Sequence, residues 1–193
     1  MDIDNFDNLK ELLVFDNDND FYVLNILKRR KDHGNSAMTK NVKSKGQYYV
    51  STAEELMEIK EKIINTCRAY NARCYINLNK RDKEVIALQT LKLTAEFIAS
   101  RQYDSIKNAY QKACGRHSAA GKEKRWILDI DNEEDDKRVI NIKKHAKITT
   151  PNGHHYIISA SKETASTELR DILLKDANTV LFAPSQLFIP SNN

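Results

Sequence analysis

The ten residues Trp126–Asp135, "WILDIDNEED", place two aspartates in and directly after a stretch hydrophobic enough for a buried strand. A carboxylate in apolar surroundings is costly unless it is paired, protonated or coordinated to a cation. Residues two apart on a strand point to the same side, so Asp129 and Asp131 would project together. If the strand instead ends at Ile130, Asp131 only begins the acidic turn "DNEEDD". The sequence leaves both interpretations open.

A shared face for the two aspartates would predict a metal site. Two carboxylates side by side repel each other unless a cation lies between them. Mg²⁺ and Mn²⁺ are hard ions that prefer oxygen ligands. The cofactor that we expect at Asp129 and Asp131 is therefore Mg²⁺ or Mn²⁺.

The segments around this stretch alternate between strand and helix patterns. The expected strands are Phe21–Lys28, Gln47–Val50, Arg73–Leu78, Trp126–Ile130, His154–Ala160 and Thr179–Ala183. The expected helices begin at Thr52, cover Lys83–Gln111 with a break near Ser100, and cover about Asp135–Lys144 and Lys162–Leu174. This order predicts an α+β protein with one central sheet, RRM-like after Trp126 and covered on one face.

Two of the expected helices have an apolar face at helical spacing. In the first helix, Thr52–Glu55 fits a capping box. Its apolar residues are Leu56, Ile59, Ile63 and Cys67, and those of the Lys83–Gln111 helix are Val85, Leu88, Leu91, Ala95 and Ile98. We expect both faces to be buried.

A Pro–Asn–Gly turn directly precedes His154 and His155, at the start of the strand after the aspartates. Asn-Gly suits a tight turn and brings its backbone close to whatever lies opposite. Neighbours on a strand alternate, so one of the two histidines would face the carboxylates. Such a histidine can bind phosphate or ligate metal. The alternative is an exposed polar strand end.

Composition and charge agree with a protein that has a polyanionic partner. The 193 residues have a formal net charge of +4, and "KRRKDHGNSAMTKNVKSK" (Lys28–Lys45) carries seven Lys or Arg against one Asp. The acidic start does not resemble a signal peptide, and no apolar run approaches a membrane span. Three irregularly spaced cysteines predict a reducing, cytoplasmic location and no disulfide framework.

Three motifs together resemble the archaeo-eukaryotic primase superfamily, in particular the small primase-polymerases of phages and plasmids. They are "WILDID", "TPNGHHYI" and "LLKDANTVLFAPS", and the resemblance covers Trp126–Ser185. It implies a single primase-polymerase-like domain over residues 1–193. That domain would have an N-terminal αβ portion (about 1–115) and a metal-binding RRM-like portion (about 120–190).

The resemblance also implies roles for individual residues. Asp129 and Asp131 would hold the divalent metals, and His155, rather than His154, would contact the triphosphate of the incoming nucleotide. A third acid would be Asp176 or, failing that, Asp171; without one, the protein would bind nucleotide but not polymerise it. Candidate cations for screening the triphosphate are Arg29, Arg30, Lys31, Lys80, Arg81 and Arg125.

The function expected from these features is metal-dependent nucleotidyl transfer that extends or initiates chains on single-stranded DNA. The expected partners are nucleoside triphosphates, the DNA template and a replicative helicase, in the bacterial host cytoplasm if the protein is phage-encoded; no membrane is involved. Two alternatives are a catalytically inactive nucleic-acid-binding or nucleotide-binding protein on the same scaffold and a metal-dependent nuclease.

Overall fold

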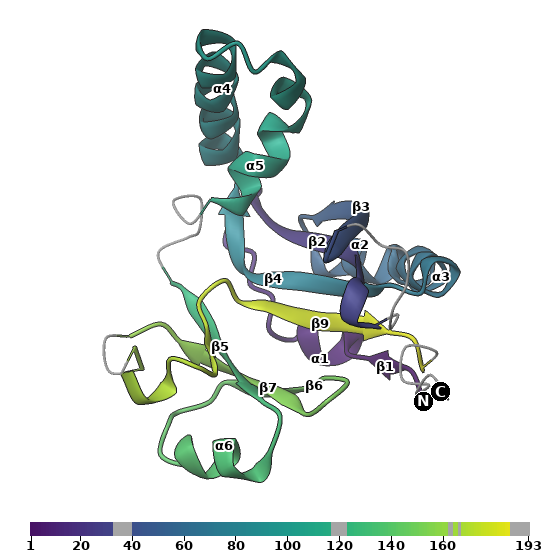
Figure 1. Ribbon diagram of the computed structural model, residues 1–193, viewed down its shortest axis with the longest axis vertical. Coiled ribbons are helices and arrows are strands. Elements are labelled where there is room, and N and C mark those ends of the chain that lie inside the picture. The colour runs from purple at the N-terminus through teal and green to yellow at the C-terminus, as the bar shows by residue number, and fades with distance from the viewer. Residues whose placement is uncertain (33–39, 117–122, 162–163, 166, 186–193) are drawn as a thin grey trace.

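The computed structural model describes residues 1–32, 40–116, 123–161, 164–165 and 167–185. They form an α+β protein with two antiparallel sheets, not the single central sheet that the sequence predicts (Figure 1). The first sheet has the order β1-β9-β4-β2-β3, with strands β1 (Ile3–Asp4), β2 (Asp20–Arg29), β3 (Val42–Val50), β4 (Arg73–Asp82) and β9 (Asn178–Ala183). The second has the order β6-β7-β5-β8, with strands β5 (Arg125–Ile130), β6 (Ala146–Thr149), β7 (His154–Ser159) and β8 (Leu173–Leu174).

The C-terminal segment differs most from the prediction. Strand β9 was expected to belong to the sheet that contains Trp126–Ile130, but it lies in the first sheet, between β1 and β4. The helix expected over Lys162–Leu174 is also wrong: the described part contains the 3-10 turn Thr167–Leu169 and strand β8. Leu169 and Ile172 are buried, and β8 pairs with β5 and satisfies backbone groups on that edge.

Six α-helices complete the described chain. Their bounds are α1 (Phe6–Lys10), α2 (Ala53–Glu58), α3 (Lys60–Tyr70), α4 (Lys83–Ala99), α5 (Ala109–Gly115) and α6 (Glu133–Arg138). The start at Thr52 is confirmed, since its hydroxyl accepts a hydrogen bond from the Glu55 amide at 3.0 Å. The expected single helix divides at Ile59 into α2 and α3. No helix in the described ranges is long and apolar enough to cross a membrane.

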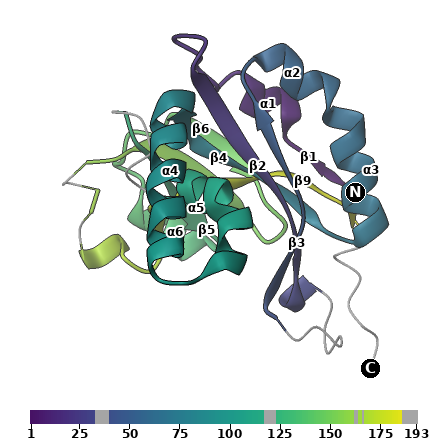
Figure 2. The same cartoon turned by 90° about the horizontal axis from the view of Figure 1, so that it is seen from above.

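Helices cover the two faces of the first sheet unequally. On one face, Leu24 and Ile26 of β2 pack into a core with Leu56 and Ile63 of α2 and α3. On the opposite face, the α4–α5 hairpin covers only one end, around Phe21 and Val23. Figure 2 shows α1–α3 and the α4–α5 hairpin on opposite sides of the sheet. We call the side towards α4 and α5 the open face, because polar side chains and two cavities lie along the rest of it.

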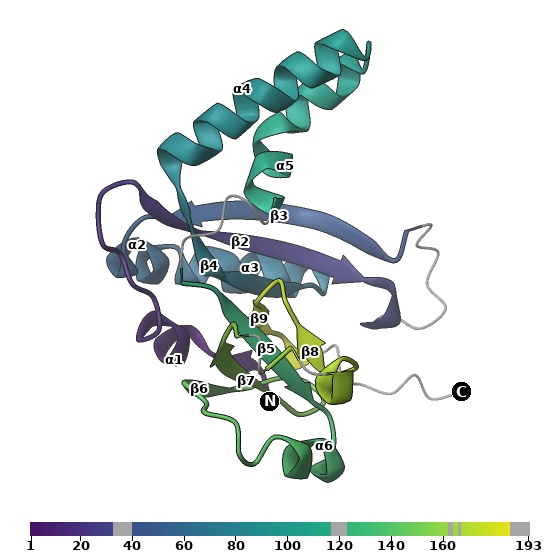
Figure 3. The same cartoon turned by 90° about the vertical axis from the view of Figure 1, so that its left-hand side faces the viewer.

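The apolar face predicted for α4 is wrong. Helix α4 and its partner α5 project away from both sheets, as Figure 3 shows. The buried side chains of α4 are Ile86, Leu93 and Phe97, and they pack against α5 and β2. The predicted face is the more exposed one: 60% of Leu88 and 68% of Leu91 are accessible. Both sides of this helix are apolar, so helical spacing alone does not identify the buried side.

Candidate functional site

The two aspartates of the opening motif line one cavity. Strand β5 ends at Ile130, so Asp131 follows the strand, while Asp129 lies within it. Their side chains nevertheless share a cavity of about 260 Å³, which we call the carboxylate cleft. It lies where the second sheet meets the open face, and Tyr75 and Val180 of the first sheet line it as well. The cleft is accessible, since 38% of the Asp129 side chain is exposed.

His155 connects this cleft to the first sheet. It lies opposite Asp129 in the β5–β7 register. Its Nε2 lies 3.2 Å from Asp129 Oδ1, and its Nδ1 lies 2.9 Å from the hydroxyl of Thr179 in β9. A carboxylate only accepts, so in the neutral ring the proton is on Nε2 and the Thr179 hydroxyl donates to Nδ1. The imidazole, 8% exposed, is therefore fixed between the two sheets.

The turn before His155 requires glycine for a steric reason. A Cβ on Gly153 would lie 2.0 Å from the carbonyl oxygen of Ile130 and 3.1 Å from the Cα of Asp131. The Gly153 amide also donates to the Thr150 hydroxyl at 3.2 Å. The close approach expected from the Asn-Gly pair is present, and it sets the backbone position of Asp131.

Two arginines provide positive charge in the carboxylate cleft. Arg29 of β2 lines it and donates to the Tyr75 hydroxyl at 2.7 Å. Arg73 of β4 lines it too, is 6% exposed and forms an ion pair with Asp32. Sequence reasoning identified Arg29 but missed Arg73. One feature of the sequence could have identified Arg73: it is the first residue of the buried strand "RCYINL", where a charged side chain needs a partner.

Several sequence candidates lie away from this cleft. His154 faces the opposite side of β7, and its Nε2 lies 3.6 Å from Asp136 Oδ1. Burial, and to a smaller extent repulsion from Lys147, lowers the pKa of its imidazole. Arg125 is at the far end of β5, about 13 Å along the strand from Asp129, and donates to the Leu12 carbonyl at 2.6 Å.

The other candidate cations divide among different surroundings. Arg30 is exposed in the 3-10 turn after β2 and does not line the cleft. Lys80 pairs with Asp16 and Asp20. Arg81 lines a second cavity, described below. The side chain of Lys31 and residues 33–39 of the basic segment lie outside the described part of the chain.

Neither candidate for a third acid lines the carboxylate cleft. Asp176 lines the second cavity, where its Oδ2 accepts from the Asn178 side chain at 2.9 Å. Asp171 is paired with Arg138 at 2.8 Å, and the hydrogen bond from this guanidinium lowers the pKa of the carboxyl to about 2. The polar residue that β9 contributes to the carboxylate cleft is Asn178.

The side chains of the carboxylate cleft suit a metal ion that takes only some of its ligands from the protein. Among the described residues there is no group of three or more His, Cys, Asp or Glu side chains that could hold a metal ion. Mg²⁺ keeps several waters and is commonly bound by one or two carboxylates plus substrate phosphates. Asp129 and Asp131 therefore fit Mg²⁺ or Mn²⁺ that arrives with a phosphate ligand, rather than a closed protein cage.

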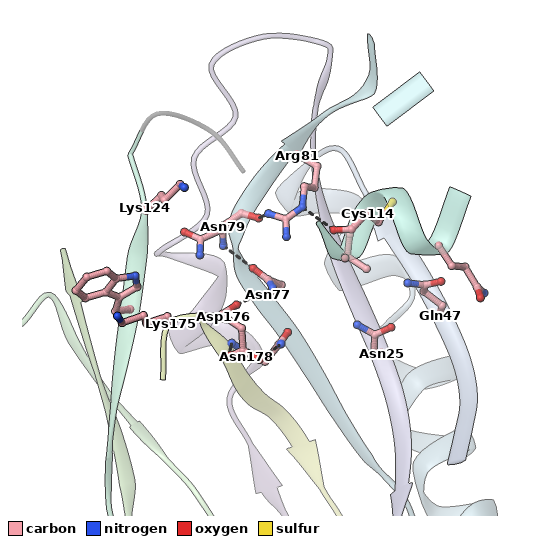
Figure 4. Close-up of a pocket in the computed structure, with 14 residues that line it drawn as sticks. Asn25, Gln47, Asn77, Asn79, Arg81, Cys114, Lys124, Lys175, Asp176 and Asn178 are labelled. Atoms are coloured by element: carbon pink, nitrogen blue, oxygen red, sulfur yellow. Dashed lines mark hydrogen bonds between the residues drawn. The ribbon is translucent and has the colours of Figure 1, made fainter. Parts of the chain in front are cut away.

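The second cavity, of about 660 Å³, occupies the middle of the open face (Figure 4). Six side-chain amides line it, and we call it the amide cleft: Asn25, Gln47, Asn77, Asn79, Gln111 and Asn178. Trp126 of β5, a strand of the second sheet, also lines it, together with Lys124 and Lys175, which are labelled in Figure 4. Asn178 lines both clefts, so they are neighbours along the same sheet face.

Comparisons with models of protein families, with curated proteins and with solved structures found no match. The resemblance to primase-polymerases therefore depends on the three sequence motifs alone.

Proposed function

We propose that the protein is a metal-dependent nucleotidyltransferase of the primase-polymerase type, which extends or initiates chains on single-stranded DNA. One observation carries the proposal: Asp129, Asp131 and His155, from two of the three motifs, line one cleft with two arginines. The proposal includes a primase-type catalytic domain as the fold, nucleoside triphosphates, a DNA template and a replicative helicase as partners, and a bacterial host cytoplasm as the location.

Each residue has a role that its surroundings support. Asp129 and Asp131 would hold the divalent ions, which when bound lower the pKa of an attacking 3′-hydroxyl and neutralise the leaving pyrophosphate. The His155 ring is held by Thr179 and Asp129, and it would contact a triphosphate by donating its Nε2 proton to a phosphate oxygen in place of Asp129. Arg29 and Arg73 add positive charge beside the phosphates.

A second candidate is nucleotide binding without transfer. It is favoured by the composition of the carboxylate cleft, where β9 contributes Asn178 and neither Asp176 nor Asp171 is present. Two carboxylates suffice to bind a metal–triphosphate complex, whereas the resemblance implies three for polymerisation. Asn178 can accept through its amide oxygen but carries no charge.

The test is an incorporation assay. The protein is incubated with Mn²⁺ or Mg²⁺, labelled nucleotides and primed or unprimed single-stranded DNA. Extension supports nucleotidyl transfer. Shortening of the DNA indicates a nuclease, and nucleotide binding without either indicates the second candidate.

The site assignment needs matched variants. Asp129→Asn with Asp131→Asn keeps the side-chain volumes but removes both charges, and we expect extension to fall at least about 1,000-fold. Asp104→Asn, an exposed carboxylate in the α4–α5 hairpin, is the control and should extend like the parent. Equal activity of the double variant and the control would show that the site is elsewhere.

A further inference from the structure

The amide cleft contains a buried cation with no acid beside it. Arg81 of β4 is 5% exposed, and its Nε and Nη1 donate to the carbonyls of Cys114 and Asn79 at 2.8 and 2.5 Å. Within the described residues no carboxylate lies within ion-pair distance of this guanidinium. Burial also lowers its pKa. An uncompensated buried charge is costly, and an anionic group in the cleft would remove that cost.

The other charges at this cleft have the same sign as Arg81. Lys124 and Lys175 are exposed on the wall opposite, and the Lys175 ammonium lies 5.3 Å from the ring centre of Trp126. The acid in the lining is Asp176, whose carboxylate is bonded to Asn178. Three cations against one engaged carboxylate favour a ligand with negative charge.

The amides divide into two groups. Asn79 is used structurally, because both ends of its amide bond the main chain of Arg125 at 2.7 and 3.1 Å. Asn77 likewise donates to the Asp176 carbonyl at 2.7 Å. Asn25 makes no side-chain hydrogen bond to the described residues, and Gln47 only accepts one from Tyr49.

Asn25 and Gln47 are direct cross-strand partners and lie side by side in Figure 4. Each amide offers donors and acceptors, the combination that pairs with the edge of a nucleobase. Trp126, in the lining opposite, provides an aromatic surface on which a base can stack.

We propose that the amide cleft binds a nucleotide unit of a single-stranded nucleic acid, with its phosphate towards Arg81, Lys124 and Lys175 and its base against Asn25 and Gln47. The volume is in the range of small-ligand sites. The choice of nucleic acid rests on the proposed function, whereas a site for an anion rests on Arg81. A strand that passes Asn178 would run from this cleft into the carboxylate cleft.

Trp126 is the single tryptophan of the chain and reports directly on this cleft. Its fluorescence is titrated in EDTA with a 12-nucleotide single strand, a nucleoside monophosphate and inorganic phosphate. We expect the oligonucleotide to change the emission saturably, at least about 10-fold more tightly than the monophosphate. No change with any of the three overturns the proposal, as does a monophosphate that binds as tightly as the strand.

Exposed lysines provide the variant test, because Arg81 also binds the end of α5 and Arg81→Met could fail to fold. Lys124→Met with Lys175→Met should reduce the slope of log affinity against log salt by about 1.4, or 0.7 for each phosphate that a lysine no longer neutralises. Lys137→Met with Lys143→Met removes the same charge from exposed positions on and after α6. If both pairs change the slope equally, the phosphates do not bind in the amide cleft.

Base contact has a separate readout, by anisotropy with labelled homopolymers. We expect the parent to prefer one of them by at least about 5-fold, the lower end for a good amide–base pair. Asn25→Ala with Gln47→Ala should abolish that preference and keep the salt slope. A parent without preference, or a variant that retains it, overturns the base contact. Since EDTA prevents catalysis, these results are independent of extension: an active enzyme without amide-cleft binding disproves this inference alone.

Discussion

The open face of the first sheet has two clefts with different chemistry. At the carboxylate cleft, β4 contributes Arg73 and Tyr75 and faces two aspartates of the β5 motif. At the amide cleft, the same strand contributes Asn77 and Asn79 and faces Lys124 and Trp126. The carboxylate cleft offers two aspartates that can bind a cation, and the amide cleft, with its buried arginine, favours anions. Strand β4 therefore contributes to two sites that differ in their need for divalent ions. The carboxylate cleft requires these ions for its function, and the amide cleft does not.

Of the single substitutions near the two clefts, Gly153→Ala should have the largest effect, because the added Cβ would lie 2.0 Å from the Ile130 carbonyl oxygen. The turn must move away from Asp131, and a displacement of about 1 Å can cost 100-fold in rate. We expect at least that loss of extension, measured with labelled nucleotides. Asp104→Asn, at an exposed position in the α4–α5 hairpin, is the control.

This glycine variant also sharpens the comparison between the clefts. Oligonucleotide binding in EDTA should be unchanged by Gly153→Ala, because the turn does not line the amide cleft. A parallel loss of binding and extension would show that the two clefts depend on each other.

A smaller effect is expected from Thr179→Val, which keeps the side-chain shape and removes the hydroxyl that donates to His155. The imidazole then loses a fixed orientation and leaves a buried nitrogen without its partner, which costs about 1–3 kcal/mol. Extension should fall roughly 10-fold. Thr149→Val, at an exposed position of β6, is the comparison. An active Thr179→Val enzyme with normal nucleotide affinity would mean that His155 is not positioned through this bond.

Asp176→Asn should have a smaller effect still, about 2-fold or less on extension. The reason is that this carboxylate lines the amide cleft and not the carboxylate cleft that contains Asp129. It accepts a hydrogen bond from Asn178. Strand binding should instead become slightly tighter, since the variant removes the negative charge among three cations. A loss of extension comparable to that of the Asp129 and Asp131 variants would make Asp176 the third catalytic acid and merge the two sites.

The smallest effect concerns acid stability and a pair outside both clefts. The pKa of Asp171, lowered to about 2 by Arg138, is below its ordinary value of 3.8. A depressed carboxyl pKa stabilises the fold above the unfolded-state pKa, and this contribution is lost as the pH falls from about 4 to 2. Asp171→Asn should therefore lower the urea midpoint slightly at pH 6 and not at pH 2. An equal shift at both pH values would exclude the ion pair as its cause.

Local patterns predicted the elements near the carboxylate cleft. Strand alternation predicted that one of His154 and His155 would face Asp129, without selecting which, and the Asn-Gly pair indicated the close approach at Gly153. Long-range pairing was not accessible in the same way. Nothing in "TVLFA" distinguishes pairing with β4 from pairing with β5, so the position of β9, and with it Thr179 and Asn178, could not be predicted. Arg73 was missed for a related reason, because only the β2–β4 pairing brings it beside Arg29.

Helix α4 shows a different limit. Its sequence has two apolar stripes, and the one that is buried depends on α5, a later segment that folds back onto it. The spacing of hydrophobic residues indicates whether a helix has an apolar side, but it does not show which element packs against that side.

The position of β9 between β1 and β4 has a consequence for synthesis of the chain. Ribosomes deliver β1 first and β9 last of the described strands, so β1 acquires its hydrogen-bonding neighbour only after residues 178–183 have been synthesised. Until then the outer edge of β4 stays unpaired and can join another nascent chain. A protein of this topology can complete its first sheet only after β9 has left the ribosome, and translation products that stop before β9 should aggregate.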